Sequence, residues 1–206
     1  MLHLAYDAAI AASQTALVAH KPGAPPTTLR LMNRETLILG TQEGESLYRL
    51  ADGCVALAQY LPDGRRQVCD ILGPGRIFGF AVQGSGQCVA EGLTYCTIER
   101  FGQSNLRANM LTELAGMLNR QQNHALLLGR KTASERVASA LIDLAQQFSR
   151  KRRSGTRTHA VFPVFPTRAD LADWLGLTLE TVSRCLHSLK RQRLIRLTRP
   201  ELISIV

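Results

Sequence analysis

The chain has 206 residues and a formal net charge of +9 at pH 7. It contains no apolar run of roughly 18 residues, the length that a membrane-spanning helix needs, and its first residues lack the leading positive cluster of a signal peptide. We therefore expect a cytoplasmic protein without a membrane partner, folded as one large domain or two modest ones.

The charge is unevenly distributed along the chain. Residues 1–129 contain ten Lys and Arg against ten Asp and Glu, whereas residues 130–206 contain fifteen against six. The whole net charge therefore lies in the C-terminal part. Such a concentration is typical of a module that binds phosphate groups, whereas a scattered excess would only favour solubility.

The cysteines and histidines argue against a metal site or an enzyme. The five cysteines are never closer than eight residues apart, which favours free thiols over disulfides or a CxxC metal knuckle. All five histidines lie outside residues 29–101, so a barrel metalloenzyme would lack its ligands. The stretch GPGRIFG lacks the GK[ST] ending of a phosphate-binding loop. We predict no enzyme activity, no metal and no cofactor.

The N-terminal part reads as a short helix followed by a small β domain. Residues 4–19 are alanine-rich, and the prolines within residues 21–26 end any regular structure. Short strand-like runs then alternate with glycine-rich turns, which predicts an antiparallel barrel or jelly roll. The clearest runs are 47–50, 54–61 and 67–72, with a hairpin turn at 62–64.

Helical periodicity begins after Phe101. One apolar row follows alternating steps of four and three residues, like a coiled-coil seam, and a second row of Leu111, Leu118 and Ala125 can face the barrel. Two rows imply two partners, and a second copy of the same helix is the simplest candidate for one of them. The alternative is a helix buried wholly inside its own domain. The predicted dimer row is Met110, Leu114, Met117, Gln121, His124 and Leu128.

Gly129 is expected to interrupt this helix and to act as a hinge. Thr132 and Glu135 then show the capping-box spacing that opens another helix. The basic linker RKRRSGTR follows, and its residues Arg152 and Arg153 are candidates for phosphate contact.

Residues 167–190 predict two short helices with Gly176 at the turn between them. Thr167 and Thr178 each stand just before a helical run, where a side-chain oxygen can accept from free backbone N–H groups. Ordinary packed helices whose polar face meets only water would show the same spacing, but the surrounding basic charge favours a binding role. The apolar positions are Leu171, Leu175, Leu177, Val182, Leu186 and Leu189.

The second of these helices is predicted to carry a polar face of Glu180, Ser183, Arg184 and His187. Glu can accept from the amino group of cytosine, Arg can grip guanine with its forked guanidinium, and Ser can serve either base. This face is therefore a usable reading head for the major groove of DNA.

Short strands flank the helix pair. Residues 161–165 form a strand that Pro163 restricts to a sheet edge. Residues 194–197 and 202–206 form a hairpin around the turn at 198–200. Helices followed by such a hairpin make a winged helix-turn-helix.

Cys185 has two possible roles. Its neighbour Arg184 could lower the pKa of the thiol, and oxidation would then disturb base reading as a redox switch. Alternatively, Cys185 fills an apolar position three residues after Val182, as buried free cysteines commonly do.

Together these segments resemble the CRP/FNR superfamily of bacterial transcription regulators, and within it the FNR/FixK branch. The resemblance is carried by LYRLADGCV, DGRRQV, PGRIFG, HALLLGRKTASERVASAL and RADLADWLGLTLETVSR. It implies an α+β chain in three parts. An N-terminal helix and a β-roll sensor domain, a jelly roll of the cyclic-nucleotide-binding kind, span 1–101. A dimerisation helix spans 102–129, and a winged helix-turn-helix spans 130–206.

In that family an E-x-x-S-R pattern on the recognition helix reads half-sites like TTGAT. By resemblance, Arg184 grips the guanine, Glu180 accepts from a cytosine and Ser183 helps to select thymine. Leu179 stands where the cyclic-AMP-responsive members carry a base-reading Arg, which disfavours their TGTGA-type site. The candidates for phosphate contact are Thr167, Arg168, Thr178, Thr181, His187, Lys190, Arg152 and Arg153.

The resemblance also implies a homodimer on palindromic double-stranded DNA that activates transcription by contacting RNA polymerase, with the hairpin tip at 62–65 as a candidate surface. The sequence departs from two kinds of family member, those that bind cyclic nucleotides and those that hold an iron–sulfur cluster. The stretch at 79–92 has no Arg to bind a cyclic-nucleotide phosphate, and no cysteine precedes Cys54, where an oxygen sensor would hold its iron–sulfur cluster. A regulator without cyclic AMP or a cluster is expected. A module gated by another small ligand stays open as the alternative.

Overall fold

The computed structural model describes residues 27–39, 47–79, 88–101, 110–149, 161–199 and 202–206. The helix expected at 4–19 and the basic linker with Arg152 and Arg153 lie outside these ranges. The strands of the N-terminal domain are β1 (Thr27–Leu31), β2 (Thr36–Ile38), β3 (Leu47–Asp52), β4 (Val55–Tyr60), β5 (Arg66–Leu72), β6 (Ile77–Phe78), β7 (Cys88–Gly92) and β8 (Cys96–Phe101). The remaining elements are α2 (Met110–Arg130), α3 (Ala133–Phe148), β9 (Val161–Pro163), α4 (Arg168–Leu175), α5 (Leu179–Arg191), β10 (Ile195–Arg199) and β11 (Leu202–Ile205).

The N-terminal strands form the predicted β-roll. They make two antiparallel four-stranded sheets with the orders β1-β8-β3-β6 and β2-β7-β4-β5. Leu50, Phe78 and Ile98 are fully buried between the sheets. The predicted hairpin joins β4 to β5, where Gly64 has a φ of 85° and the N–H of Leu61 donates to the carbonyl of Arg65 at 2.8 Å.

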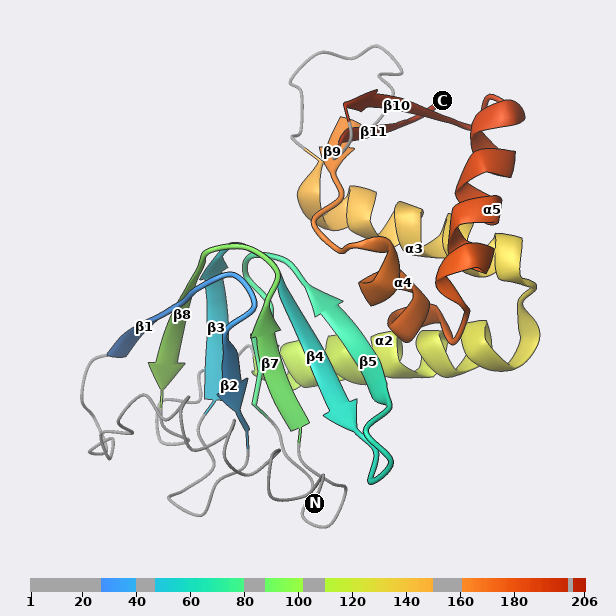
Figure 1. Cartoon of the computed structure of the whole chain (residues 1–206). Helices are drawn as coiled ribbons and strands as arrows, with labels where there is room; N and C mark the ends of the chain where they lie inside the picture. The colour runs from blue at the N-terminus through green and yellow to red at the C-terminus, as the bar shows by residue number, and fades with distance from the viewer. Residues whose placement is uncertain (1–26, 40–46, 80–87, 102–109, 150–160, 200–201) are drawn as a thin grey trace.

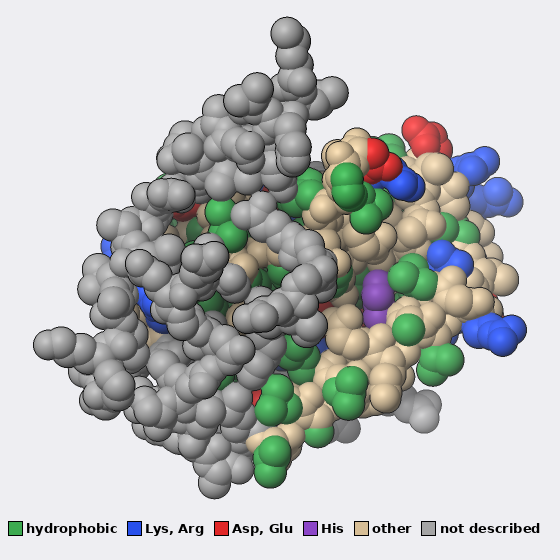
Figure 2. Space-filling view, turned by 90° about the horizontal axis from the view of Figure 1, so that it is seen from below, with side chains coloured by type: hydrophobic (Ala, Val, Ile, Leu, Met, Phe, Trp, Pro, Cys, Tyr) green, Lys and Arg blue, Asp and Glu red, His purple; other side chains and the backbone are tan. Residues whose placement is uncertain are grey.

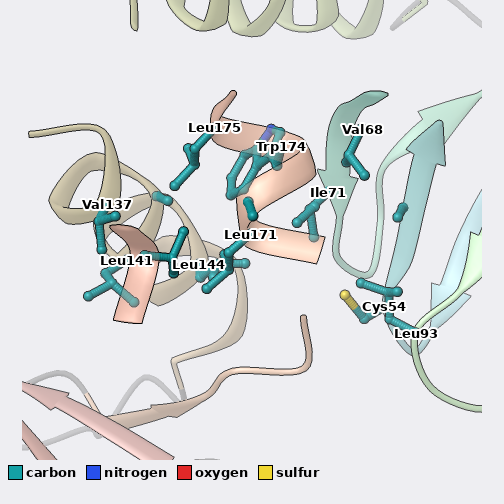
Figure 3. Close-up of a cluster of buried hydrophobic side chains, with 14 of the residues drawn as sticks. Cys54, Val68, Ile71, Leu93, Val137, Leu141, Leu144, Leu171, Trp174 and Leu175 are labelled. Carbon is teal, nitrogen blue, oxygen red and sulfur yellow. The ribbon is translucent and has the colours of Figure 1, made fainter. Parts of the chain in front are cut away.

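Both faces of the second sheet are buried. Side chains alternate along β4, so that Val55 points between the sheets while Ala56 and Ala58 point outward. These small outward residues belong to an apolar cluster that continues into the C-terminal helices. Figure 3 shows Ile71 and Val68 of β5 beside Leu171 and Trp174 of α4. The β-roll and the C-terminal domain therefore share one apolar core.

Helix α2 runs from behind the β-roll to beneath α4 and α5 (Figure 1). The expectation that Gly129 interrupts it is wrong, because α2 continues to Arg130. The chain breaks instead at Thr132, which caps α3. Its side chain accepts from the N–H of Glu135 at 3.4 Å, and the carboxylate of Glu135 accepts in return from the N–H of Thr132 at 2.8 Å. The predicted capping box is therefore present.

The row of α2 that was expected to face the barrel is exposed, whereas part of the expected dimer row is covered by the same chain. Leu111 and Leu118, expected to face the barrel, are 80 % and 60 % exposed, and Ala125 is also exposed. His124, expected in a dimer seam, instead stacks on Trp174 of the same chain with ring centroids 6.1 Å apart. The last seam residue, Leu128, packs against the shared apolar core.

The single chain also partly covers other residues of the predicted dimer row. Leu114, Met117 and Gln121 are half-buried along α2, and the side chain of Met110 lies outside the described residues. Arg120, beside them, donates to Asp70 of β5 at 3.1 Å. The sequence of α2 contains two rows with a similar period of about 3.5 residues. Periodicity alone therefore does not show which row packs against the rest of the same chain and which stays exposed.

The C-terminal domain is the predicted winged helix-turn-helix. Thr167 and Thr178 cap α4 and α5, and their hydroxyls accept from the backbone N–H groups of Asp170 and Thr181. Gly176 turns the chain between the helices in the left-handed conformation (φ 60°, ψ 44°). Strands β10 and β11 form the wing, with β9 at the sheet edge as expected. Within the described ranges, no helix is long and apolar enough to cross a membrane.

The turn at Gly176 gives a stability prediction. The substitution Gly176→Ala should destabilise the fold by roughly 1 kcal/mol, because L residues are disfavoured in the left-handed region. The matched substitution Gly116→Ala, inside α2, should stabilise it by about 0.5–1 kcal/mol, since the nearest heavy atom to an added Cβ lies 3.9 Å away. Urea denaturation of both variants measures the difference, and equal effects would contradict the assignment of the turn.

Candidate nucleic-acid interface

Helix α5 has the two faces that its spacing predicts. Val182 and Leu189 are buried against the rest of the domain, whereas Glu180, Arg184 and His187 are exposed. Ser183 is half-buried between them. The helix therefore presents a continuous polar face, anchored from behind by apolar contacts.

Neighbouring side chains hold this face in place. Arg184 donates through Nη2 to Oγ1 of Thr181 at 3.1 Å, and Arg168 donates through Nη1 to Oγ of Ser183 at 3.4 Å. Hydrogen bonds from its own backbone N–H and from Thr178, together with the charge of Arg184, lower the pKa of Glu180. Glu180 is thus a carboxylate at neutral pH and can only accept hydrogen bonds.

Six of the predicted phosphate-contacting residues lie in the described part of the chain, on α5 or at the starts of α4 and α5. Thr167, Arg168 and Thr178 lie at the starts of α4 and α5, where free backbone N–H groups attract anions. An open groove of about 870 Å³ runs beside them to the β-roll, and its lining contains cations but no carboxylate. The lining contains three cationic side chains, Arg34, Arg168 and Lys190, and also His187.

Cys185 lies on the side of α5 that faces the protein. It is half-buried and packs against the shared apolar core. This placement agrees with the packing alternative. Among the described residues, no group of three or more His, Cys, Asp or Glu could hold a metal ion.

An ion cluster joins this interface to the β-roll, and the sequence did not reveal it. Arg34 binds Asp170 of α4 with both guanidinium nitrogens, at 3.0 and 2.9 Å, and Glu91 of β7 at 2.9 Å. Arg66 of β5 binds Asp170 at 3.0 Å, Asp173 at 2.9 Å and Glu91 at 2.7 Å. We call these five residues the interdomain ion cluster.

Asp170 is the centre of the cluster. Its side chain is only 2 % exposed, and it also accepts from the N–H of Thr167 at 2.9 Å as part of the capping box of α4. Burial alone would raise the pKa of Asp170, but the hydrogen bonds from Arg34 and Thr167 outweigh it and hold the pKa well below the usual value. The carboxylate is therefore charged whenever the protein is folded at neutral pH.

The contact between α2 and α4 contains two buried nitrogens. The ring nitrogen Nε2 of His124 and the indole Nε1 of Trp174 have no hydrogen-bond partner. Burial lowers the pKa of His124, which favours the neutral ring. An aromatic stack of this kind fixes α2 against α4 without adding charge.

The ion cluster predicts a pH-dependent stability. Replacing Asp170 by Asn should destabilise the protein by roughly 3 kcal/mol at pH 7, because two cations lose a buried partner. A carboxylate with a lowered folded pKa contributes stability above its unfolded pKa of about 4, and that contribution is lost as pH falls further. Urea denaturation at several pH values between about 5 and about 3 should show the two proteins converging.

The exposed carboxylate of Asp52 provides the control for this prediction. The substitution Asp52→Asn should change the free energy of unfolding by less than about 0.5 kcal/mol. A constant difference between wild type and Asp170→Asn at every pH would contradict the role of the charge.

Two family models match the chain. The cyclic nucleotide-binding domain matches residues 28–112, and the Crp-like helix-turn-helix domain matches residues 135–206. These ranges coincide with the β-roll and with the three C-terminal helices and the wing.

Similar proteins come from the same family. The nitrogen fixation regulation protein FixK of Rhizobium meliloti (strain 1021) is 36 % identical, over 98 % of this chain and 95 % of that protein. The protein of the same name from Azorhizobium caulinodans is 37 % identical over 91 % and 79 %. The solved structure of FixK2 from Bradyrhizobium japonicum covers 88 % of this chain and 93 % of its own, with a TM-score of 0.75 and 29 % identity. The chain therefore belongs to the CRP/FNR family as a FixK-like transcription regulator with a helix-turn-helix DNA-binding domain.

Proposed function

We propose that the protein binds a TTGAT-like palindrome as a homodimer and activates transcription without cyclic AMP or an iron–sulfur cluster. The observation that carries this proposal is the exposed polar face of α5, with Glu180, Ser183 and Arg184 in the E-x-x-S-R spacing. Among the relatives, the Transcriptional activatory protein AadR of Rhodopseudomonas palustris is 33 % identical over 79 % of this chain.

Each reading residue has the chemistry that its base requires. The guanidinium of Arg184 is exposed and can donate two parallel hydrogen bonds to guanine. The charged carboxylate of Glu180 accepts from the amino group of a cytosine, and the hydroxyl of Ser183 lies beside both. Leu179, in contrast, is 47 % exposed and has no polar group. This supports a TTGAT-like half-site over one that needs an Arg at that position.

The exposed side of α2 is the proposed dimer surface, and it replaces the seam expected from the sequence. Five apolar or small residues and one glutamine recur there at steps of four and three, and all six are exposed. Figure 2 shows apolar side chains reaching the surface on the side where α2 lies. A second copy of α2 would cover them. The row consists of Leu111, Ala115, Leu118, Gln122, Ala125 and Gly129.

A symmetric dimer of this kind suits palindromic DNA. Two copies of α5 related by a two-fold axis would enter successive major grooves, roughly 34 Å apart. Arg168, Lys190 and the basic linker would add contacts to the phosphates, which makes binding salt-dependent.

The residues of the β-roll support a regulator that works without cyclic AMP and without an iron–sulfur cluster. The stretch at 79–92 contains no Arg for a cyclic-nucleotide phosphate. Burial raises the pKa of the thiols of Cys54, Cys69 and Cys88, the last to about 11. Iron–sulfur clusters bind thiolates, whereas the surroundings of these thiols, buried at Cys54 and half-buried at Cys69 and Cys88, favour the protonated form.

Activation requires a surface for RNA polymerase, and the hairpin tip between β4 and β5 is the proposed one. Asp63 and Arg65 are exposed there and bind each other at 2.7 Å. Strands β4 and β5 pair up to Tyr60 and Arg66, so the turn projects from the end of a paired hairpin.

The reading head predicts a loss of specific binding. Arg184→Ala should weaken binding to a TTGAT-N4-ATCAA duplex by about 5- to 150-fold, which corresponds to about 1–3 kcal/mol. Wild type, without added effector, should prefer this duplex to a scrambled one in a mobility shift. The control is Arg130→Ala, at the exposed end of α2. Equal binding of wild type to both duplexes would refute the proposed site.

The dimer surface predicts a change of oligomeric state. Leu118→Glu should convert the dimer to a monomer and weaken palindrome binding, because two carboxylates would face each other across the two-fold axis. Ile142→Glu, at an aliphatic residue of α3 that is 51 % exposed against 60 % for Leu118, should leave the dimer intact. Sedimentation equilibrium measures both. A dimeric Leu118→Glu variant would exclude this face of α2.

A further inference from the structure

We propose that Arg34 and Arg66 of the β-roll are positioning residues for DNA recognition. Through Asp170 they set the angle at which each subunit presents α5, and so they determine which spacing between half-sites the dimer accepts. The inference rests on the proposed palindrome binding, but it concerns residues that lie in the other domain from the reading head.

The first step is the geometry of the interdomain ion cluster. Its two cations come from the β-roll, at Arg34 and on β5, and two of its carboxylates come from α4. Arg34 approaches Asp170 with both nitrogens, while Arg66 spans Asp170, Asp173 and Glu91. Forked, charge-assisted bonds of this kind fix direction as well as distance. This set of bonds therefore restrains the rotation of α4 against the β-roll more than a single bond would.

The second step is the way the β-roll aims Arg34. The residue has a φ of 67°, in the left-handed region that L residues rarely adopt. The turn is kept by the N–H of Arg34, which donates to the carbonyl of Gly92 at 2.7 Å. A Cβ on Gly92 would lie only 2.5 Å from the carbonyl oxygen of Met32. The turn therefore sits directly against β7, and its unfavourable backbone conformation directs the guanidinium toward α4.

The third step leads from Asp170 to the reading face. Asp170 lies in the first turn of α4 and caps that helix together with Thr167. Only Gly176, Leu177 and Thr178 separate α4 from α5, and the two helices pack on each other. A rotation of α4 would therefore carry the polar face of α5 with it.

The shared apolar core and the interdomain ion cluster play different parts at the domain boundary. The shared apolar core holds the two domains together, but the hydrophobic effect itself is non-directional. In the ion cluster, by contrast, a rotation would leave buried charges without partners, which is strongly unfavourable. The side chains of Asp170, Glu91 and Arg66 are only 2 %, 10 % and 15 % exposed. The apolar core therefore holds the two domains together, and the ion cluster favours one orientation of the DNA-binding domain relative to the β-roll.

The test measures spacing preference in the full-length protein. Wild type, Arg66→Gln and Arg34→Gln would be titrated onto duplexes with two TTGAT half-sites separated by three, four, five or six base pairs, and onto a duplex with one half-site. The control is Arg65→Gln at the tip of the β4–β5 hairpin, whose exposed side chain forms an ion pair with Asp63 and lies outside the interdomain ion cluster. Thermal unfolding of each variant would be recorded alongside.

We expect wild type and Arg65→Gln to favour one spacing by at least about tenfold. Arg66→Gln should reduce that preference to about threefold or less, while its affinity for the single half-site stays within about twofold of wild type. Arg34→Gln should show the same direction to a smaller extent. Because Arg34 is 44 % exposed and Arg66 would still neutralise Asp170, this variant keeps the test available if Arg66→Gln does not fold.

Two outcomes would overturn the proposal in different ways. A lower melting temperature with an unchanged spacing preference would show that the cluster only stabilises the fold. Failure of wild type to prefer any TTGAT duplex over a scrambled one would refute the proposed function itself, and the positioning role with it. A preference that collapses only in the two cluster variants would support the role of Arg34 and Arg66.

Discussion

The buried carboxylate of Asp170 is the constraint on which the arrangement of the two domains depends. It cannot lie at the domain boundary without cations, and the cations come from the β-roll. The same carboxylate completes the capping box of α4 with Thr167. One group thus begins the first helix of the DNA-binding pair and joins that helix to the other domain. Any movement of α4 relative to β5 must break several charge-assisted bonds at once.

Helix α2 also contacts both sides of the boundary between the β-roll and α4. Arg120 binds Asp70 on the same strand that carries Arg66, and His124 stacks on Trp174, one residue after Asp173. Near the end of α2, Arg136 of α3 donates to the carbonyl oxygens of Leu128 and Leu175. The proposed dimer helix, the β-roll and the reading head therefore meet around α4. A change in how two copies of α2 pack would reach α4 through these direct contacts.

The sequence predicted the parts whose information is local. Caps such as Thr167, the turn at Gly176 and the apolar row of α5 depend on neighbours within a few residues, and the structure has them as expected. The ion cluster depends on pairs separated by up to 136 residues, which a single sequence does not connect. Thr167 was predicted as the cap of α4, whereas no local pattern singled out Asp170, which completes that capping box and binds Arg34 and Arg66. The prediction of which row of α2 faces the barrel was wrong for a related reason. Periodicity identifies the apolar faces of a helix, but the packing partner determines which face is covered.

The ion cluster also gives the β-roll a role that does not depend on ligand binding. If the roll binds no cyclic nucleotide, as proposed, sensing does not explain why its strands pack so closely on the DNA-binding domain. Strands β5 and β7 supply Arg66 and Glu91, and the turn before β2 supplies Arg34. In a regulator gated by a ligand, binding energy must select one orientation of the reading helices. Here fixed ion pairs can select it, so the roll would act as a permanent support for one orientation of the reading helices.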